Sequence, residues 1–129
     1  MTTNVVVSRI TLFSSKMDLA AEFYNAIGLN LGKSVHGWGP GYNYLDVIRN
    51  KEQDIIFEIY PLAYGTPVVS PQGLGFDIEG LQQTLQKLVA MDVPVIRPGN
   101  PRVYSHCSLA VVRDPDGRSV TLTQHRREE

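Results

Sequence analysis

The chain has 129 residues, with 12 Lys and Arg against 13 Asp and Glu, so its formal net charge is -1. This balance provides no basic surface for nucleic acid, and no apolar run approaches the roughly 20 residues of a membrane span. The single cysteine, Cys107, excludes an intramolecular disulfide and a cysteine-based zinc site. Since the first residues lack the pattern of a signal peptide, we expect a single cytoplasmic domain over residues 1–129.

The first half of the sequence predicts one helix among four strands. Residues 5–13 alternate and are rich in β-branched side chains, as in a strand. A helix is expected to follow, with Ser15 as its N-cap and Gly28 at its C-terminal end. Three further strands are expected at residues 29–32, 42–48 and 55–60.

The second half of the sequence repeats this order. A strand is predicted at residues 74–78 and a helix at residues 80–91. Later strands are expected at residues 93–96, 108–113 and 119–123, the last two joined by a tight turn at residues 114–117. Sliding the chain by 64 residues places apolar on apolar, for example Ile10 on Leu74. We therefore predict an α+β fold in which a βαβββ module occurs twice, at about residues 5–62 and 72–124.

Period-two alternation divides the strands of each module between two faces. One face is apolar and is expected to pack against the helices. The other face is mixed, and we expect a ligand to bind there. Its members are Arg9, Thr11, Phe13, Ile56, Glu58, Tyr60, Gly73, Gly75, Asp77, Ser119, Thr121 and Thr123.

The sequence resembles the vicinal oxygen chelate superfamily, which includes glyoxalase I, extradiol dioxygenases, and fosfomycin- and bleomycin-resistance proteins. The matching segments are residues 10–15, 18–29, 57–59, 74–78, 114–117 and 120–122. The resemblance extends over about residues 5–124. It implies two βαβββ modules that form a cup-shaped mixed sheet, and a homodimer that completes its binding pockets at the subunit interface.

The resemblance also indicates where a metal would bind. In the metalloenzymes of this superfamily, four strand positions supply the ligands, and they correspond here to Arg9, Glu58, Gly73 and Thr121. Only Glu58 is an anionic ligand, whereas Arg9 is a permanent cation. His36, His106 and His125 share no close spacing. We therefore predict no metal site and no cofactor.

Arg9 and Glu58 are expected to form an ion pair across neighbouring strands. In one interpretation the pair is a buried electrostatic plug that fixes strand pairing. In the other, Arg9 faces a ligand and Glu58 orients it. The sequence leaves both interpretations open.

Aromatic residues gather outside the helices, around the expected cup. Residues 36–44 are rich in glycine and contain His36, Trp38 and Tyr44. They indicate either a mobile flap that can stack on a flat ligand or a loop whose aromatic residues pack on the core, and we favour the flap. The set of residues predicted to bind a ligand is Arg9, Thr11, Phe13, His36, Trp38, Tyr44, Glu58, Tyr60 and Thr121.

These features favour a metal-independent protein of the glyoxalase/bleomycin-resistance type that sequesters a drug or a metabolite, and the sequence does not decide whether it also catalyses a reaction. The alternative is a glyoxalase- or dioxygenase-like metalloenzyme that uses Glu58 with non-standard ligands. A metal-free isomerase or lyase, with Glu58 or His36 as proton carrier, and an interaction module without a small ligand also remain open.

Overall fold

A computed structural model describes residues 7–35, 42–49, 53–62, 73–96 and 102–126 of the chain. The first half contains β1 (Arg9–Ser14), α1 (Met17–Ala26), β2 (Gly32–Val35), β3 (Tyr42–Ile48) and β4 (Ile55–Pro61). The second half contains β5 (Leu74–Asp77), α2 (Leu81–Ala90), β6 (Arg102–Val103), β7 (Cys107–Arg113) and β8 (Ser119–His125).

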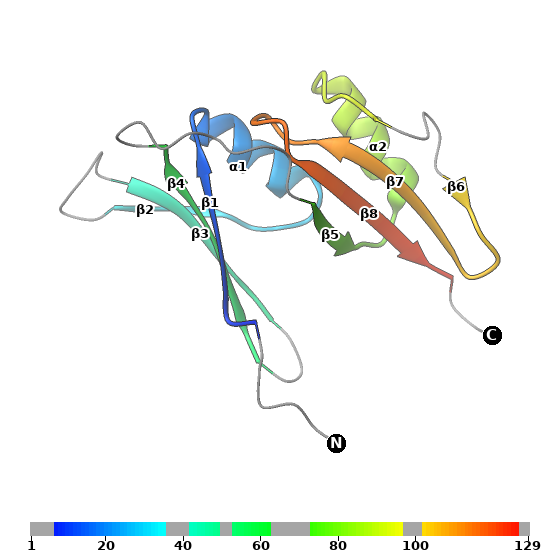
Figure 1. Cartoon of the computed structure of the whole chain (residues 1–129), viewed down its shortest axis with the longest axis horizontal. Coiled ribbons are helices and arrows are strands. Elements are labelled where there is room, and N and C mark those ends of the chain that lie inside the picture. Colours follow the sequence, from blue (N-terminus) through cyan, green and yellow to red (C-terminus); the bar gives the residue numbers. More distant parts are fainter. Residues whose placement is uncertain (1–6, 36–41, 50–52, 63–72, 97–101, 127–129) are drawn as a thin grey trace.

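Each half forms its own four-stranded mixed sheet. The strand orders are β1-β4-β3-β2 and β5-β8-β7-β6. In each sheet the first strand of the module is parallel to the last, and the other neighbours are antiparallel. The order confirms the predicted α+β fold with two βαβββ modules. Figure 1 shows the two sheets diverging below the helices, and within the described residues no ladder joins them.

One apolar core connects both modules beneath the helices. The Tyr24 ring of α1 lies 5.1 Å from the Phe57 ring of β4 and 6.2 Å from the Phe76 ring of β5. The Phe57 and Phe76 rings are 6.0 Å apart, and Leu85 and Leu88 of α2 belong to the same core. Neither helix of the described structure is long and apolar enough to span a membrane.

A polar network between β7 and β8 also joins the modules. The Tyr24 hydroxyl donates to the buried Asp114 carboxylate at 2.6 Å, and Arg118 pairs with the same carboxylate at 3.0 Å. Arg118 also donates to the carbonyl of Phe13, while the Ser14 hydroxyl donates to Asp116. Burial raises the pKa of Tyr24, and the nearby Asp114 carboxylate raises it further. The end of β1 is thereby attached to the second module.

Several boundaries in the first module differ from the predictions. Val7 and Ser8, expected in the first strand, precede β1. Lys16, not Ser15, is the N-cap of α1, because the Ser15 backbone N–H and hydroxyl both donate to Asp116. The strand predicted at residues 29–32 begins only at Gly32. The Asn25 side chain accepts a hydrogen bond from the Leu31 N–H and donates one to the Leu31 carbonyl. These bonds keep residues 29–31 from pairing with β3.

The second module differs at residues 93–96, which were predicted to be a strand. Only Val95 forms a bridge there, to Val112 of β7. Pro94 lacks an N–H and contributes only its carbonyl, which accepts from Arg113. The fourth strand of this sheet is instead β6, paired with the other end of β7.

Candidate ligand-binding site

The polar side chains of the first sheet lie on the face turned away from the helices. Phe57 and Ile59 are fully buried in the core, so Glu58, between them in β4, points to the opposite side. Strand register assigns residues of all four strands to this open face. They are Arg9, Thr11 and Phe13 of β1, Ile56, Glu58 and Tyr60 of β4, Asn43, Leu45 and Val47 of β3, and Gly32 and Ser34 of β2.

Glu58 is the polar centre of the open face. It lies beside Thr11 in β1 and Leu45 in β3, and its side chain is only 9% exposed. Its Oε1 atom accepts a hydrogen bond from the Thr11 hydroxyl at 2.8 Å and lies 3.4 Å from Arg9 Nε. The Arg9 side chain is 59% exposed. The predicted ion pair is therefore present, with a buried carboxylate and a guanidinium that reaches solvent.

An aromatic pair lies next to this centre. Phe13 is directly opposite Tyr60 in the parallel ladder of β1 and β4, and their ring centroids are 6.5 Å apart at 43°. Phe13 is 46% exposed, which is unusual for so large an apolar side chain. The pair offers a flat ligand an apolar surface beside Glu58.

Asn43 is a further polar residue of the open face, and the sequence pattern did not predict it. Asn43 lies opposite Ser34 in β2 and, by continuation of the β3–β4 register, next to Tyr60. It is only 4% exposed, yet its amide makes no hydrogen bond with any other residue of the described structure. A buried amide of this kind is expected to have a partner. Alternation within residues 42–48 does not identify it, because both sides of this segment carry polar atoms.

Tyr44, predicted to contact a ligand from the glycine-rich flap, lies in β3 and does not share the open face. It lies opposite Ile59 and packs against the core, and its hydroxyl donates to Asp18 of α1 at 2.6 Å. This hydrogen bond is the main cause that raises the pKa of Tyr44 to about 12. The Tyr44–Asp18 hydrogen bond attaches β3 to α1, and Tyr44 is not part of the site.

The other predicted residues lie elsewhere. Thr121 is in the second sheet, between Gly75 of β5 and Val111 of β7, on the face turned away from the helices. His36 and Trp38 lie outside the described residues. The structure therefore brings together Arg9, Thr11, Phe13, Glu58 and Tyr60 of the predicted set.

The four positions that correspond to metal ligands in the resembled enzymes do not fit a metal ion. Arg9 brings a cation within 3.4 Å of the carboxylate at Glu58, Gly73 has no side chain, and Thr121 offers one neutral hydroxyl. Within the described residues no three His, Cys, Asp or Glu side chains lie close enough together to hold a metal. The described residues of this face offer hydrogen bonds and aromatic stacking.

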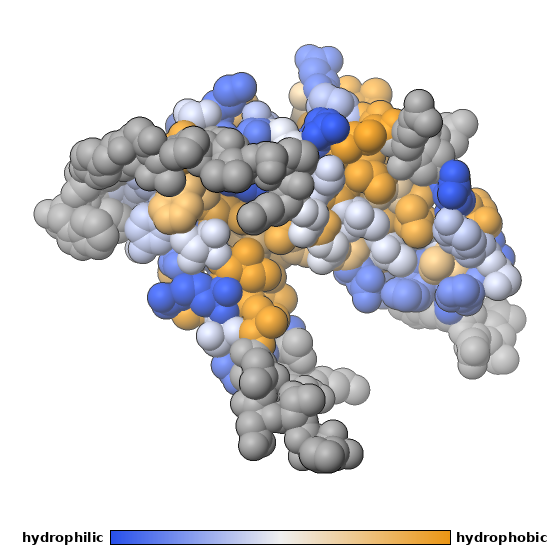
Figure 2. All heavy atoms as spheres, in the orientation of Figure 1, coloured by the Kyte–Doolittle hydropathy of each residue, from blue (hydrophilic) through white to orange (hydrophobic). Residues whose placement is uncertain are grey.

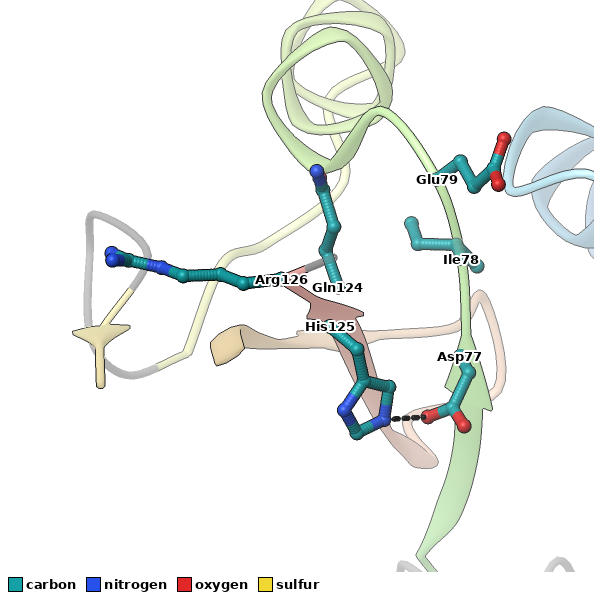
Figure 3. A pocket seen from close by; sticks show the side chains of 6 residues that line it. All are labelled: Asp77, Ile78, Glu79, Gln124, His125 and Arg126. Carbon is teal, nitrogen blue, oxygen red and sulfur yellow. Dashed lines mark ion pairs between the residues drawn. The ribbon is translucent and has the colours of Figure 1, made fainter. Parts of the chain in front are cut away.

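A separate cavity of about 760 Å³ lies at the ends of β5 and β8. Figure 3 shows the Asp77 and His125 side chains facing each other across these strands, with Oδ1 and Nε2 3.3 Å apart. Their side chains are 74% and 58% exposed, so water screens the pair. This shallow, solvated hollow holds no buried polar group, and we do not assign the site to it.

Several solved structures share the fold of this chain. The structure superposes with TnmS3, an antibiotic-binding protein from Streptomyces sp. CB03234, with a TM-score of 0.68 at 18% identity, over 98% of this chain and 100% of that one. A glyoxylase/bleomycin resistance protein/dioxygenase domain from Frankia sp. EAN1pec gives 0.62 at 16% identity, over 96% and 100%. Lactoylglutathione lyase from Agrobacterium tumefaciens gives 0.59 at 17% identity, over 95% of each chain. No protein-family model and no curated protein matches the sequence.

These similarities define the fold of the chain. An antibiotic-binding protein and a lyase share its two-module architecture over nearly their whole lengths. The chain has the fold of the vicinal oxygen chelate superfamily, as its sequence pattern predicted. At identities of 18% or less, the comparisons establish this fold, and the function has to be argued from the site.

Proposed function

We propose that the chain is a metal-independent cytoplasmic protein that binds and sequesters a small organic molecule on the open face of its first sheet. The observation that carries this proposal is the Arg9–Glu58 pair. By the resemblance, its two positions correspond to metal-ligand positions of the metalloenzymes, and the pair leaves a guanidinium 59% exposed beside a buried carboxylate.

The surroundings of the pair support binding of an organic molecule. Phe13 and Tyr60 provide an aromatic surface, and Asn43 provides a buried amide on the same face. The similarity to TnmS3, which is an antibiotic-binding protein, agrees with this function. A drug or a metabolite with a flat ring system is the class of ligand that such a face favours.

We further propose that the protein acts as a homodimer. Within the described residues, β1 and β5 are edge strands, whose free backbone groups are available to pair with another chain. Apolar side chains reach the surface along the first sheet, which Figure 2 shows below the helices, and Val7 and Phe13 are 60% and 46% exposed. A second copy that covers these edges would enclose the open face.

A thermal-shift screen against a panel of aromatic drugs and metabolites tests this function. A ligand present at about 100 times its Kd stabilises the folded state by about 2.7 kcal/mol, which raises Tm by several degrees. We expect such a ligand to lose affinity in Arg9→Ala and to keep it in Asp77→Asn, which removes a carboxylate from the second sheet. Stoichiometric Ni, Zn, Fe or Mn in protein purified without chelator would contradict metal-independent binding.

A further inference from the structure

We infer that the open face recognises a neutral, planar ligand that carries an N–H or O–H donor directly beside a carbonyl group. This inference rests on the proposed small-molecule function and specifies the chemistry of the ligand. It follows from the hydrogen-bonding capacity that remains on Glu58, Arg9 and Asn43.

The donor of the ligand is specified by Glu58. Both neighbours of this carboxylate, the Thr11 hydroxyl and Arg9 Nε, approach the same atom, Oε1. Within the described residues Oε2 accepts no hydrogen bond, and the side chain is only 9% exposed to solvent. An ionised carboxylate only accepts hydrogen bonds, so the group that satisfies Oε2 is a donor.

The carbonyl of the ligand is specified by Arg9. Its Nε faces Glu58, and its two terminal amino groups have no partner among the residues that the structure describes. A guanidinium only donates, so its complement is an acceptor such as a carbonyl oxygen. A site that presents an acceptor and a donor side by side matches a ligand edge that presents a donor beside an acceptor.

The charge of the pair indicates that the ligand is neutral. Arg9 and Glu58 carry opposite charges and balance each other. An anion would be repelled by the buried carboxylate, and a cation by the guanidinium next to it. A lactam, an imide or a hydroxy-ketone satisfies both groups without adding a charge.

The neighbouring residues specify a flat ring. Phe13 and Tyr60 lie in the cross-strand row next to Thr11 and Glu58, so a ring that stacks on them directs one edge at the carboxylate. Asn43 adjoins Tyr60, and its buried amide offers one donor and one acceptor function to a second polar group of the ligand.

Two isosteric probes test the inference on the unaltered protein. Phenanthridinone is a tricyclic lactam with an N–H beside its carbonyl, and benzocoumarin is the matching lactone, with a ring oxygen in place of that N–H. The lactone places an acceptor against Glu58 Oε2. We expect fluorescence titration to show that the lactam binds about tenfold more tightly, because the lactone leaves the buried carboxylate oxygen unsatisfied.

The variant Glu58→Gln should change this preference in a predictable direction. Arg9 Nε can only donate, so the amide oxygen of the new side chain takes the Oε1 position. Its NH2 group then takes the Oε2 position and replaces an acceptor by a donor. We expect the variant to bind benzocoumarin at least as tightly as phenanthridinone. Glu22→Gln, which removes an exposed carboxylate from α1, should keep the preference of the unaltered protein.

The outcomes separate this inference from the proposed function. A lactam preference that disappears in Glu58→Gln and persists in Glu22→Gln supports it. Equal binding of the two probes by the unaltered protein overturns the inference, while the binding itself supports the small-molecule function. Failure of both probes to bind also overturns the inference, and the thermal-shift screen then decides the proposed function separately.

Discussion

Arg9 and Glu58 differ sharply in their exposure to solvent, and this difference distinguishes the two roles that the sequence left open for the pair. A plug that fixes strand pairing requires both charges to be buried. The Arg9 side chain is 59% exposed, and its Nε lies 3.4 Å from the carboxylate. An ion pair that is open to water on one side contributes about 0–1 kcal/mol to folding. The exposure therefore favours the ligand-facing role.

The variant Arg9→Ala tests this difference directly. We expect it to lower the free energy of unfolding by less than about 1 kcal/mol, because the ion pair is solvated. We expect the same change to weaken binding of a ligand from the screen by about tenfold or more, because it removes a charged donor. Urea unfolding and calorimetric titration measure the two effects. A large loss of stability with unchanged affinity would contradict the ligand-facing role and support the electrostatic plug.

Alternation along β1 and β4 predicted the faces on which Arg9, Thr11 and Glu58 lie, because each strand has one clearly apolar side. It was less informative for β3, where both faces carry polar atoms. The Tyr44 ring packs on the core while its hydroxyl reaches Asp18, so an aromatic residue expected at the ligand belongs to the helix side. Asn43 was overlooked for the same reason.

At the scale of elements, the turn between β7 and β8 has two functions. Its Asp-Pro-Asp-Gly sequence predicted the local reversal of the chain. The contacts of Asp116 with Ser14 and Ser15, about 100 residues earlier in the chain, have no local signal. Hydrophobic periodicity and turn residues predict structure that forms between neighbours along the chain. This contact instead arises because one module packs on the other.

Gly117 of this turn has a φ of +91°, which favours glycine. We expect Gly117→Ala to lower the free energy of unfolding by about 1–2 kcal/mol through backbone strain. Gly75→Ala in β5 is the matched control, because an added Cβ meets nothing within 4 Å at either position and only Gly117 has a positive φ. The control should change stability by less than about 0.5 kcal/mol, or increase it slightly. Equal losses in chemical unfolding would contradict backbone strain as the cause.

At the scale of the whole molecule, the two sheets expose edges that a second chain can cover. The sequence pattern predicted both modules, because each has its own periodicity. It carries no signal for the way in which the two sheets meet or separate. Figure 1 shows that β1 and β5 each border the gap between the diverging sheets.

The proposed homodimer predicts a dependence on protein concentration. We expect light scattering to give twice the 14.4 kDa mass of the chain at micromolar concentrations. Tm should rise with concentration, because association stabilises the folded state by mass action. A mass of one chain, with a Tm that does not change over a hundredfold range of concentration, would contradict the dimer.

The hydrogen bond between Tyr24 and Asp114 has a consequence for the history of such a chain. The hydroxyl belongs to one half, and the carboxylate that accepts its hydrogen bond belongs to the other, so the buried hydroxyl of the first half is satisfied only when the second half is present. A half transplanted from a related protein that lacks this counterpart would bury an unsatisfied polar atom. We therefore expect a chimera that exchanges one half alone to be less stable than a chain that keeps both halves together.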